Sequence, residues 1–286
     1  YGSVVAVSGL NLVVEKGEAI CLLGANGAGK TTTLYALAGT ILPTTGTVRI
    51  FGKDARKEFV SIAGRIGFLP EKPAFFDFLT ARENLIMAAR LARKDITVDK
   101  ALDRVGLLHV ANAKVKTFSL GMRQRLGLAQ AILTEPDLLI LDEPFTGLDP
   151  ECTTEMLKML RSFVDIAKVT IVFSSHLLHE VETLADRVAV LNHGRLLACD
   201  QIHSVLAYDS SEVDVLVDSP AAAANRLASQ PWVERVSEEP NLIRVRLKDA
   251  TTHQLIVFLM SQGFVLLGVI PRRRTLRDYL MKVCNT

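Results

Sequence analysis

The pattern of apolar and polar positions predicts two regions of different architecture. Up to about residue 208, short apolar runs alternate with longer stretches that have helical spacing. The clearest runs cover residues 18–23, 138–141 and 169–173. Strands that are apolar on both faces and separated by helices are typical of a parallel sheet covered by helices. The first region, which we place at residues 1–208, is therefore predicted to be an α/β domain.

Two features add detail to this domain. Residues 80–131 carry no strand pattern and are predicted to be a helical subdomain, with Thr80 and Glu83 spaced as a capping box at a helix start. Residues 188–191 and 196–199 flank Asn192-His193-Gly194, a turn sequence that predicts a β-hairpin.

The pattern changes after residue 208. Strand-like segments at 213–217, 232–236, 242–247 and 264–270 are interleaved with helical segments at 220–228, 251–260 and 275–283. This β-α-β-β-α-β-α order predicts a small α+β domain over residues 209–286. The fold class expected for the whole chain is thus α/β, with a small C-terminal α+β domain.

Composition excludes several classes of protein. The 286 residues are 49% hydrophobic and carry a formal net charge of +2, so no nucleic-acid partner is expected. Four cysteines stand far apart, which fits neither a disulfide framework nor a zinc site and indicates a reducing compartment. No signal peptide is visible. The longest apolar stretch, residues 255–270, is interrupted and shorter than the about 20 residues of a spanning helix.

The strongest chemical signal follows the first apolar run. Residues 24–31 are Gly-Ala-Asn-Gly-Ala-Gly-Lys-Thr, which matches G-x-x-x-x-G-K-[ST] between a predicted strand and a predicted helix. In such a P-loop, backbone N–H groups and the helix N-terminus bind phosphate, the lysine reaches the β- and γ-phosphates, and the Thr hydroxyl ligates Mg²⁺. The nucleotide-binding residues predicted here are Gly24, Asn26, Gly27, Ala28, Gly29, Lys30, Thr31 and Thr32.

Two carboxylates follow the second apolar run. Asp142 and Glu143 come directly after residues 138–141, at the end of a strand expected to lie beside the P-loop. Asp142 is predicted to hold Mg²⁺ together with Thr31. Glu143 would point toward the γ-phosphate and is predicted to act as the general base for an attacking water.

From these residues on, the chain resembles the ATP-binding subunits of ATP-binding cassette (ABC) transporters, over residues 1 to about 208. The segment Phe-Thr-Gly-Leu-Asp, ending at Asp149, resembles the family's D-loop, and Ser174-Ser175-His176 resembles its switch histidine. Tyr1 stands where the family places an aromatic ring under the adenine. The resemblance implies that ATP is the nucleotide, that Mg²⁺ is the cofactor, and that His176 is catalytic.

The family's signature motif is present in altered form, as Phe-Ser-Leu-Gly-Met at residues 118–122. Ser119 and Gly121 remain, and the resemblance implies that they bind the γ-phosphate of an ATP held by a partner subunit. Leu120 replaces a glycine, which raises the question of whether a positive φ is needed there. Met122 replaces a hydrogen-bonding glutamine. Such changes resemble the exporter-type branch of the family.

Glu71 stands where the family generally has a glutamine that ligates Mg²⁺, and we expect it to keep that role. It is followed by residues 72–79, with Phe75, Phe76 and Phe78, which we expect to form part of a groove for a permease helix. The resemblance implies a membrane permease on a separate chain and a second ATP-binding subunit, either a copy or a paralogue. The chain would then lie at the cytoplasmic face of the cell membrane, as a peripheral protein.

There are two rivals to the transporter function. A soluble ABC ATPase acting on ribosomes or nucleic acid would usually carry two cassettes or a long coiled coil, whereas this chain has one P-loop and no sustained heptads. It stays the alternative to the transporter. A GTPase or small-molecule kinase lacks a base-reading Asn-Lys-x-Asp motif here and leaves the signature motif unexplained.

Overall fold

The computed structural model describes residues 4–92, 96–248, 250–273 and 275–284; for residues 208–210 and 273 it describes the backbone only. Contacts divide the chain into two units. The first runs from the N-terminus to Ile202 and takes in the chain from Leu280 onward, and the second is His203–Tyr279. The boundary expected from the sequence, at residues 208–209, stays a prediction.

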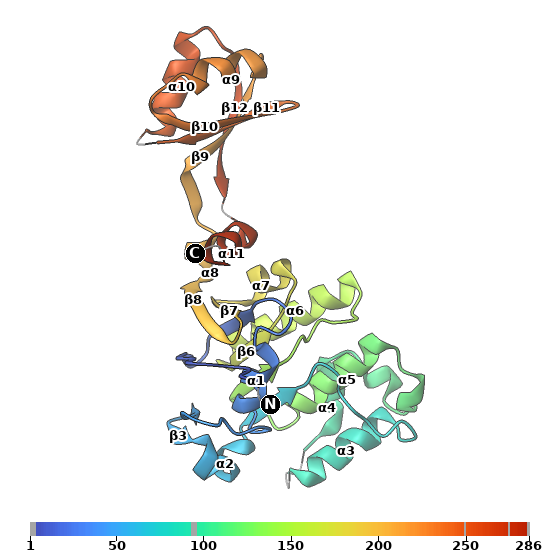
Figure 1. Cartoon of the computed structure of the whole chain (residues 1–286). Helices are drawn as coiled ribbons and strands as arrows, with labels where there is room; N and C mark the ends of the chain where they lie inside the picture. The colour runs from blue at the N-terminus through green and yellow to red at the C-terminus, as the bar shows by residue number, and fades with distance from the viewer. Residues whose placement is uncertain (1–3, 93–95, 249, 274, 285–286) are drawn as a thin grey trace. The chain divides into compact units, whose positions relative to one another are not determined.

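The first unit is built on a sheet of six strands in the order β4-β5-β6-β1-β7-β8 (Figure 1). Neighbouring strands from β4 to β7 run parallel, and only β8 is antiparallel to its neighbour. The strands are β1 (Ala19–Leu23), β4 (Ile66–Leu69), β5 (Leu138–Leu141), β6 (Thr170–Ser174), β7 (Arg187–Asn192) and β8 (Arg195–Gln201). Because the first five are parallel, their carboxyl ends lie along one edge of the sheet.

Helices cover this sheet, so both faces of its central strands are buried and apolar. Every residue of β1, β5 and β6 is buried, and Ile20, Leu34, Ile140 and Val172 belong to one core cluster. The remaining elements here are α1 (Lys30–Leu37), β2 (Arg49–Ile50), β3 (Lys53–Asp54), α2 (Ala55–Ala63), α6 (Pro150–Asp165) and α7 (Leu178–Leu184). The short helix α8 (Ile202–Val205) begins at the last residue of this unit and continues in the second. The α/β fold expected from the sequence is confirmed.

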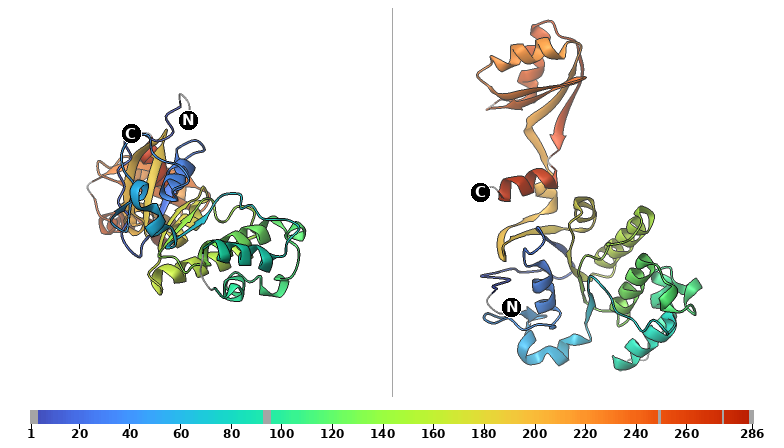
Figure 2. Two further views of the ribbon diagram at one scale, coloured as in Figure 1. Left: turned by 90° about the horizontal axis from the view of Figure 1, so that it is seen from below. Right: turned by 45° about the vertical axis from the view of Figure 1, so that its right-hand side comes forward.

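Between β4 and β5 the chain forms a group of helices beside the sheet (Figures 1 and 2). These are α3 (Ala81–Leu91), α4 (Val98–Arg104) and α5 (Leu120–Ile132), with short 3₁₀ turns at Leu108–Val110 and Val115–Thr117. The predicted capping box is present, since the Thr80 N–H donates to Glu83 Oε2 at 2.7 Å and the Glu83 N–H donates to Thr80 Oγ1 at 3.1 Å. The segment expected to be helical thus contains α3, α4 and α5, and its status as a subdomain stays a prediction.

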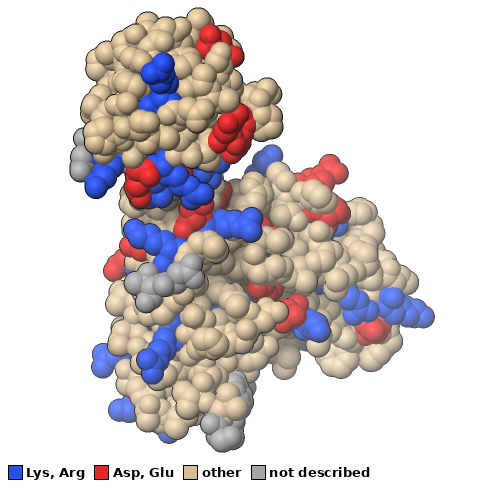
Figure 3. Space-filling model, turned by 45° about the horizontal axis from the view of Figure 1, so that its top comes forward, with Lys and Arg blue, Asp and Glu red and all other residues tan. Residues whose placement is uncertain are grey.

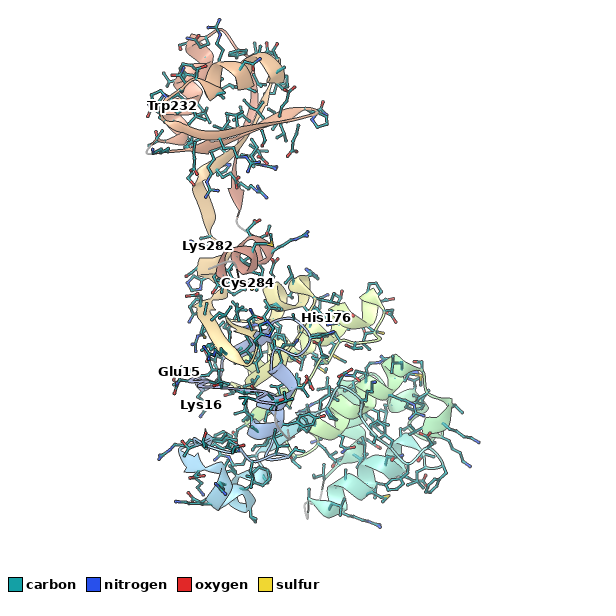
Figure 4. The ribbon with its side chains drawn as sticks, viewed as in Figure 1. Glu15, Lys16, His176, Trp232, Lys282 and Cys284 are labelled. Carbon is teal, nitrogen blue, oxygen red and sulfur yellow. The ribbon has the colours of Figure 1, made fainter. Side chains whose placement is uncertain are left out.

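The second unit is a four-stranded antiparallel sheet in the order β10-β11-β9-β12, packed against two helices. Its core contains Val213, Val215, Ile243 and Val245, and the Trp232 ring, labelled in Figure 4, meets Phe258 edge-on. Its elements are β9 (Tyr208–Val217), α9 (Pro220–Ala228), β10 (Val233–Glu239), β11 (Leu242–Leu247), α10 (Thr252–Ser261) and β12 (Leu266–Arg273), followed by α11 (Leu276–Cys284). The predicted order of strands and helices matches this arrangement.

As expected from the sequence, the end of β5 lies beside the P-loop, since Thr31 Oγ1 donates to Asp142 Oδ1 at 3.2 Å. In the sheet, β6 lies between β5 and the P-loop strand β1, an order that the sequence did not predict. In addition, β4 and the β2–β3 pair were not predicted, because each is too short to give a clear local pattern. The placement of β6 matters for the site, since its end brings Ser174 next to Asp142.

Candidate functional site

The segments that follow four parallel strands gather around one cavity at the carboxyl edge of the sheet. The P-loop follows β1, Glu71 follows β4, Glu143 follows β5, and His176, labelled in Figure 4, follows β6. Ligands of open parallel sheets bind at this edge. The cavity has a volume of about 750 Å³ and is lined by residues 4–6, residues 26–32, Glu71, Glu143, Thr146, His176 and His193.

The P-loop needs glycine at two positions for steric reasons. A Cβ on Gly24 would lie 2.3 Å from the carbonyl oxygen of Leu191, so the loop can leave β1 here only without a side chain. Gly29 has a φ of +100°, and a Cβ there would lie 2.7 Å from the Ala6 carbonyl oxygen. The loop thereby turns directly into α1, whose N-terminus and free N–H groups face the cavity and favour an anion.

Lys30 is held inside this loop. Its side chain is 7% exposed, and its Nζ donates to the carbonyl oxygens of Gly24 at 2.8 Å and Ala25 at 3.2 Å. Carbonyl oxygens only partly offset a buried positive charge, because they carry no full negative charge themselves. The loop therefore combines backbone donors with a cation in a cavity that suits a polyphosphate.

Asp142 is the fully buried carboxylate behind the P-loop. Its Oδ1 accepts hydrogen bonds from Ser174 Oγ at 2.7 Å and from Thr31 Oγ1 at 3.2 Å. Its Oδ2 is buried and has no hydrogen-bond partner among the described residues. A buried carboxylate oxygen without a partner is costly, and a cation would relieve that cost. Asp142 and Thr31 thus fit Mg²⁺, which is usually bound by one or two carboxylates, water and phosphate.

Glu143 and His176 form a pair at the wall of the cavity. The Glu143 side chain is 16% exposed, and its Oε2 lies 2.7 Å from His176 Nδ1. The Glu143 backbone has a φ of 48°, in the left-handed region that non-glycine residues rarely adopt. Its N–H donates to Ser174 Oγ at 2.8 Å, which helps to hold this strained turn. The carboxylate is therefore fixed where it can accept a proton from a water in the cavity.

Comparison with known proteins identifies the family. The ABC transporter family model matches residues 7–146. The bacitracin transport ATP-binding protein of Bacillus licheniformis is 46% identical over 69% of this chain, although that match spans 65% of its own length, just under two thirds. The Nod factor export ATP-binding protein I of Burkholderia lata is 34% identical over 88% of this chain and 87% of its own length.

The chain belongs to the ATP-binding proteins of ABC transporters. Members of this family hydrolyse ATP to power transport, so the chain is an ATPase of that kind. A solved dimeric ATP-binding cassette, in a post-hydrolysis state with ADP and Pi, superimposes with a TM-score of 0.65. At 23% identity over 70% of this chain and 91% of that one, the likeness shows a shared fold.

Four described residues predicted for nucleotide contact do not line the cavity. Gly24 lies at the start of the P-loop, and the other three lie at helix starts outside the cavity. Ser119 is the N-cap of α5 and accepts from the Met122 N–H at 3.2 Å, and Gly121 lies in the first turn of the same helix. Asp149 is the N-cap of α6 and accepts from the Cys152 N–H at 2.8 Å, a hydrogen bond that lowers the pKa of its carboxyl group. Within one chain these three residues therefore serve as helix caps or first-turn residues, and their contact with nucleotide stays a prediction.

The altered signature motif causes no backbone strain. Leu120 begins α5, and it is not one of the described non-glycine residues with a positive φ. The position therefore does not need the glycine that Leu120 replaces. Its side chain lies against Gly147, where an added Cβ would stand 2.3 Å from Leu120 Cδ2. The signature motif is thus packed directly on the loop that leads to Asp149. Tyr1, predicted to stack on adenine, lies outside the described residues.

Sequence reasoning missed several residues that the structure places at the site, residues 4–6 of the cavity wall among them. Ser174 joins Asp142 to the Glu143 backbone, while Thr146 and His193 line the cavity wall. Two serines before His176, at the end of an apolar strand, were a signal for Ser174. The positions of Thr146 and His193 depend on how distant loops meet, which no local pattern gives.

No helix among the described residues is both long and apolar enough to span a bilayer. On the face shown in Figure 3, Lys and Arg side chains are interspersed with Asp and Glu among uncharged residues. That face therefore carries no continuous basic stripe of the kind that tracks a phosphate backbone.

Ser174→Ala is expected to loosen the site and lower stability. It would leave Asp142 Oδ1 and the Glu143 N–H each without one buried partner, at a cost of about 1–3 kcal/mol. Ser162→Ala is the matched control, because the Ser162 hydroxyl only bonds back to the Met159 carbonyl within α6. Urea unfolding of both variants measures the difference; equal stability of the two variants would contradict the role given to Ser174.

Proposed function

We propose that the chain drives a membrane exporter by binding and hydrolysing ATP between two cassettes. The observation that carries this proposal is that the cavity contains only part of the predicted ATP site. It contains the P-loop, Glu143 and His176, whereas the N-terminus of α5 with Ser119 lies elsewhere in the same chain. A second chain is needed to bring such a helix N-terminus to the γ-phosphate.

In this proposal, residues 24–32 bind the phosphates through backbone N–H groups, and Lys30 exchanges its carbonyl partners for the β- and γ-phosphates. Mg²⁺, held by Thr31 and Asp142 with Glu71 at the cavity rim, supplies charge neutralisation for the phosphates. The buried, partnerless Oδ2 of Asp142 supports this assignment. The exposed Glu71 side chain lines the same cavity, which supports its place near the cation.

For hydrolysis, Glu143 accepts the proton of the attacking water. His176, next to it, contacts the γ-phosphate. Their 2.7 Å contact lets the imidazole orient the carboxylate before ATP arrives. Most of the rate enhancement then comes from positioning and from charges placed in advance. The left-handed backbone of Glu143 supports this role, because strained residues cluster at functional sites.

The second cassette, a copy of this chain or a paralogue, would complete each site head to tail. Ser119 and Gly121 would then bind the γ-phosphate of the partner's ATP at the N-terminus of α5, and Asp149 would reach across the same interface. The packing of Leu120 on Gly147 supports this pairing, because it makes the signature motif and the Asp149 loop move as one surface.

The permease contact is proposed at the loop between β4 and α3. Phe76 and Phe78 are 51% and 67% exposed, with ring centroids 5.9 Å apart, so they form a fixed apolar surface. The buried Asn84 holds the loop, since its Oδ1 accepts from the Phe76 N–H at 2.9 Å. Exposed aromatic pairs of this kind are typical energetic anchors of interfaces.

This loop is also connected to the signature helix. Asp77, between the two aromatics, forms an ion pair with Arg123 of α5 at 2.8 Å. A permease that moves the aromatic loop would therefore move Ser119 as well, and Glu71 at the other end of the loop would carry the motion to the cation. The chain would accordingly sit at the cytoplasmic face of the membrane, as a peripheral subunit.

Export is the direction favoured by the relatives. One of them is named for bacitracin transport and the other for Nod factor export. Neither name refers to ribosomes or nucleic acid, so the soluble alternative has no support among them. The small C-terminal unit is proposed to be a regulatory domain.

Glu143→Gln is expected to keep ATP binding but to lower turnover by about 10²–10⁴-fold, because an amide cannot take the proton of the water. An ATP-bound dimer should accumulate and be visible by size-exclusion chromatography alongside phosphate release. Glu155→Gln is the control, since Glu155 is exposed on α6 and does not line the cavity. Near-wild-type turnover of Glu143→Gln would contradict the proposed reaction.

Phe78→Ser is expected to release the chain from membranes that contain its permease, while the ATPase activity of the isolated chain persists. Loss of an interface anchor costs about 2 kcal/mol or more, which is about 30-fold in affinity. Val60→Ser is the matched control, because Val60 is 95% exposed on α2, away from this loop. Membrane fractionation compares the two variants; equal retention would place the permease contact elsewhere.

A further inference from the structure

A buried polar pair lies beneath the loop that carries His176. Ser175 is fully buried and Glu180 is 4% exposed, although neither is explained by the chemistry of the cavity. The Ser175 hydroxyl donates a short hydrogen bond to Glu180 Oε2. The same hydroxyl oxygen accepts from the Leu177 N–H at 3.0 Å. The Glu180 side chain of α7 is thereby joined, by way of the Ser175 hydroxyl, to the Leu177 backbone on the other side of His176.

The position of His176 follows from this short turn. Its side chain is 57% exposed, so packing alone does not hold the ring. On one side, Ser175 is fixed by Glu180, and on the other, the Leu177 carbonyl accepts from the Glu180 N–H at 3.1 Å. Both residues that flank His176 are therefore tied to Glu180, four positions along the chain.

The burial of Glu180 disfavours a charged carboxyl group there, because desolvation costs free energy. Burial raises the pKa of Glu180, and the Ser175 hydrogen bond acts in the opposite direction. Burial also raises the pKa of the Cys21 thiol on β1, and the Ser175 backbone acts in the opposite direction. A leucine would bury apolar surface at such a place at no desolvation cost. The acid is therefore best explained by the hydrogen bond that it accepts.

We propose that Glu180 is a positioning residue for ATP hydrolysis, which holds His176 against Glu143 by way of the Ser175 hydroxyl. The inference rests on the proposed function of His176 and Glu143 and extends it to a residue outside the cavity. Glu180 touches neither nucleotide nor water in this role, and it acts only by fixing the turn.

Two substitutions in the full chain separate hydrogen bonding from packing. Glu180→Gln keeps an oxygen that accepts from Ser175, and it should leave kcat within about 3-fold of wild type, because the hydrogen bond that fixes the turn is retained. Glu180→Leu fills the space without an acceptor, and it should lower kcat by about 10- to 100-fold, the scale of a small misplacement in an active site. The KM for ATP should change little in either variant, because the P-loop is untouched.

A purely structural role for Glu180 gives a different pattern. Glu180→Leu would then preserve kcat. Alternatively, it would lower both thermal stability and kcat and would also change the KM for ATP. Either result overturns the inference. If Glu180→Leu does not fold, Ser175→Ala removes the hydroxyl that joins Glu180 to the turn, and it should show the same loss in kcat with KM unchanged.

Combining these changes with His176→Ala shows which proposal fails. If Glu180 acts by way of His176, Glu180→Leu should lower kcat by less than about 2-fold further in the His176→Ala background, because coupled residues are not additive. Full turnover of His176→Ala alone would contradict the proposed function of His176. Loss of turnover in His176→Ala, with wild-type kcat in Glu180→Leu, would overturn the Glu180 inference only.

Discussion

The burial of the Asp142 carboxylate is the constraint on which the rest of the site depends. This group is fully enclosed at the end of β5, yet only one of its two oxygens has hydrogen-bond partners among the described residues. Those partners, Ser174 at the end of β6 and Thr31 after the P-loop, come from two other parts of the sheet edge. A cation beside this charge would offset the cost of burying it, which supports the proposed site for Mg²⁺ and a polyphosphate.

The carboxyl edge of the parallel sheet brings together only part of the proposed site within one chain. Parallel strands can bring the P-loop, Glu143 and His176 together, because all three follow strand ends. The chain leaves the sheet after β4, forms α3, α4 and α5, and returns at β5, and Ser119 at the N-terminus of α5 lies outside the cavity. The ion pair of Asp77 with Arg123 and the contact of Leu120 with Gly147 link this subdomain to surfaces that partners could use.

Local sequence patterns were sufficient for much of the fold and for the main chemistry. Apolar runs located β1, β5 and β6, and spacing alone located the P-loop, the two carboxylates and the capping box at Thr80. The order of strands was not predictable, because sheet order depends on contacts between distant segments. The same reason applies to Ser174, which reaches Asp142 because β6 lies beside β5, and to Ser175 and Glu180, whose pairing depends on how α7 folds back.

The most direct test of the account is a structure of the wild-type chain with Mg²⁺ and a non-hydrolysable ATP analogue. The account predicts two nucleotides in a symmetric dimer, each with its phosphates on the P-loop of one chain and its γ-phosphate at Ser119 of the other. Asp142 and Thr31 should then lie in the ligand shell of the cation. The analogue bound to a monomer, with Ser119 still exposed to solvent, would contradict it if the same chain hydrolyses ATP normally at the same protein concentration in a parallel assay.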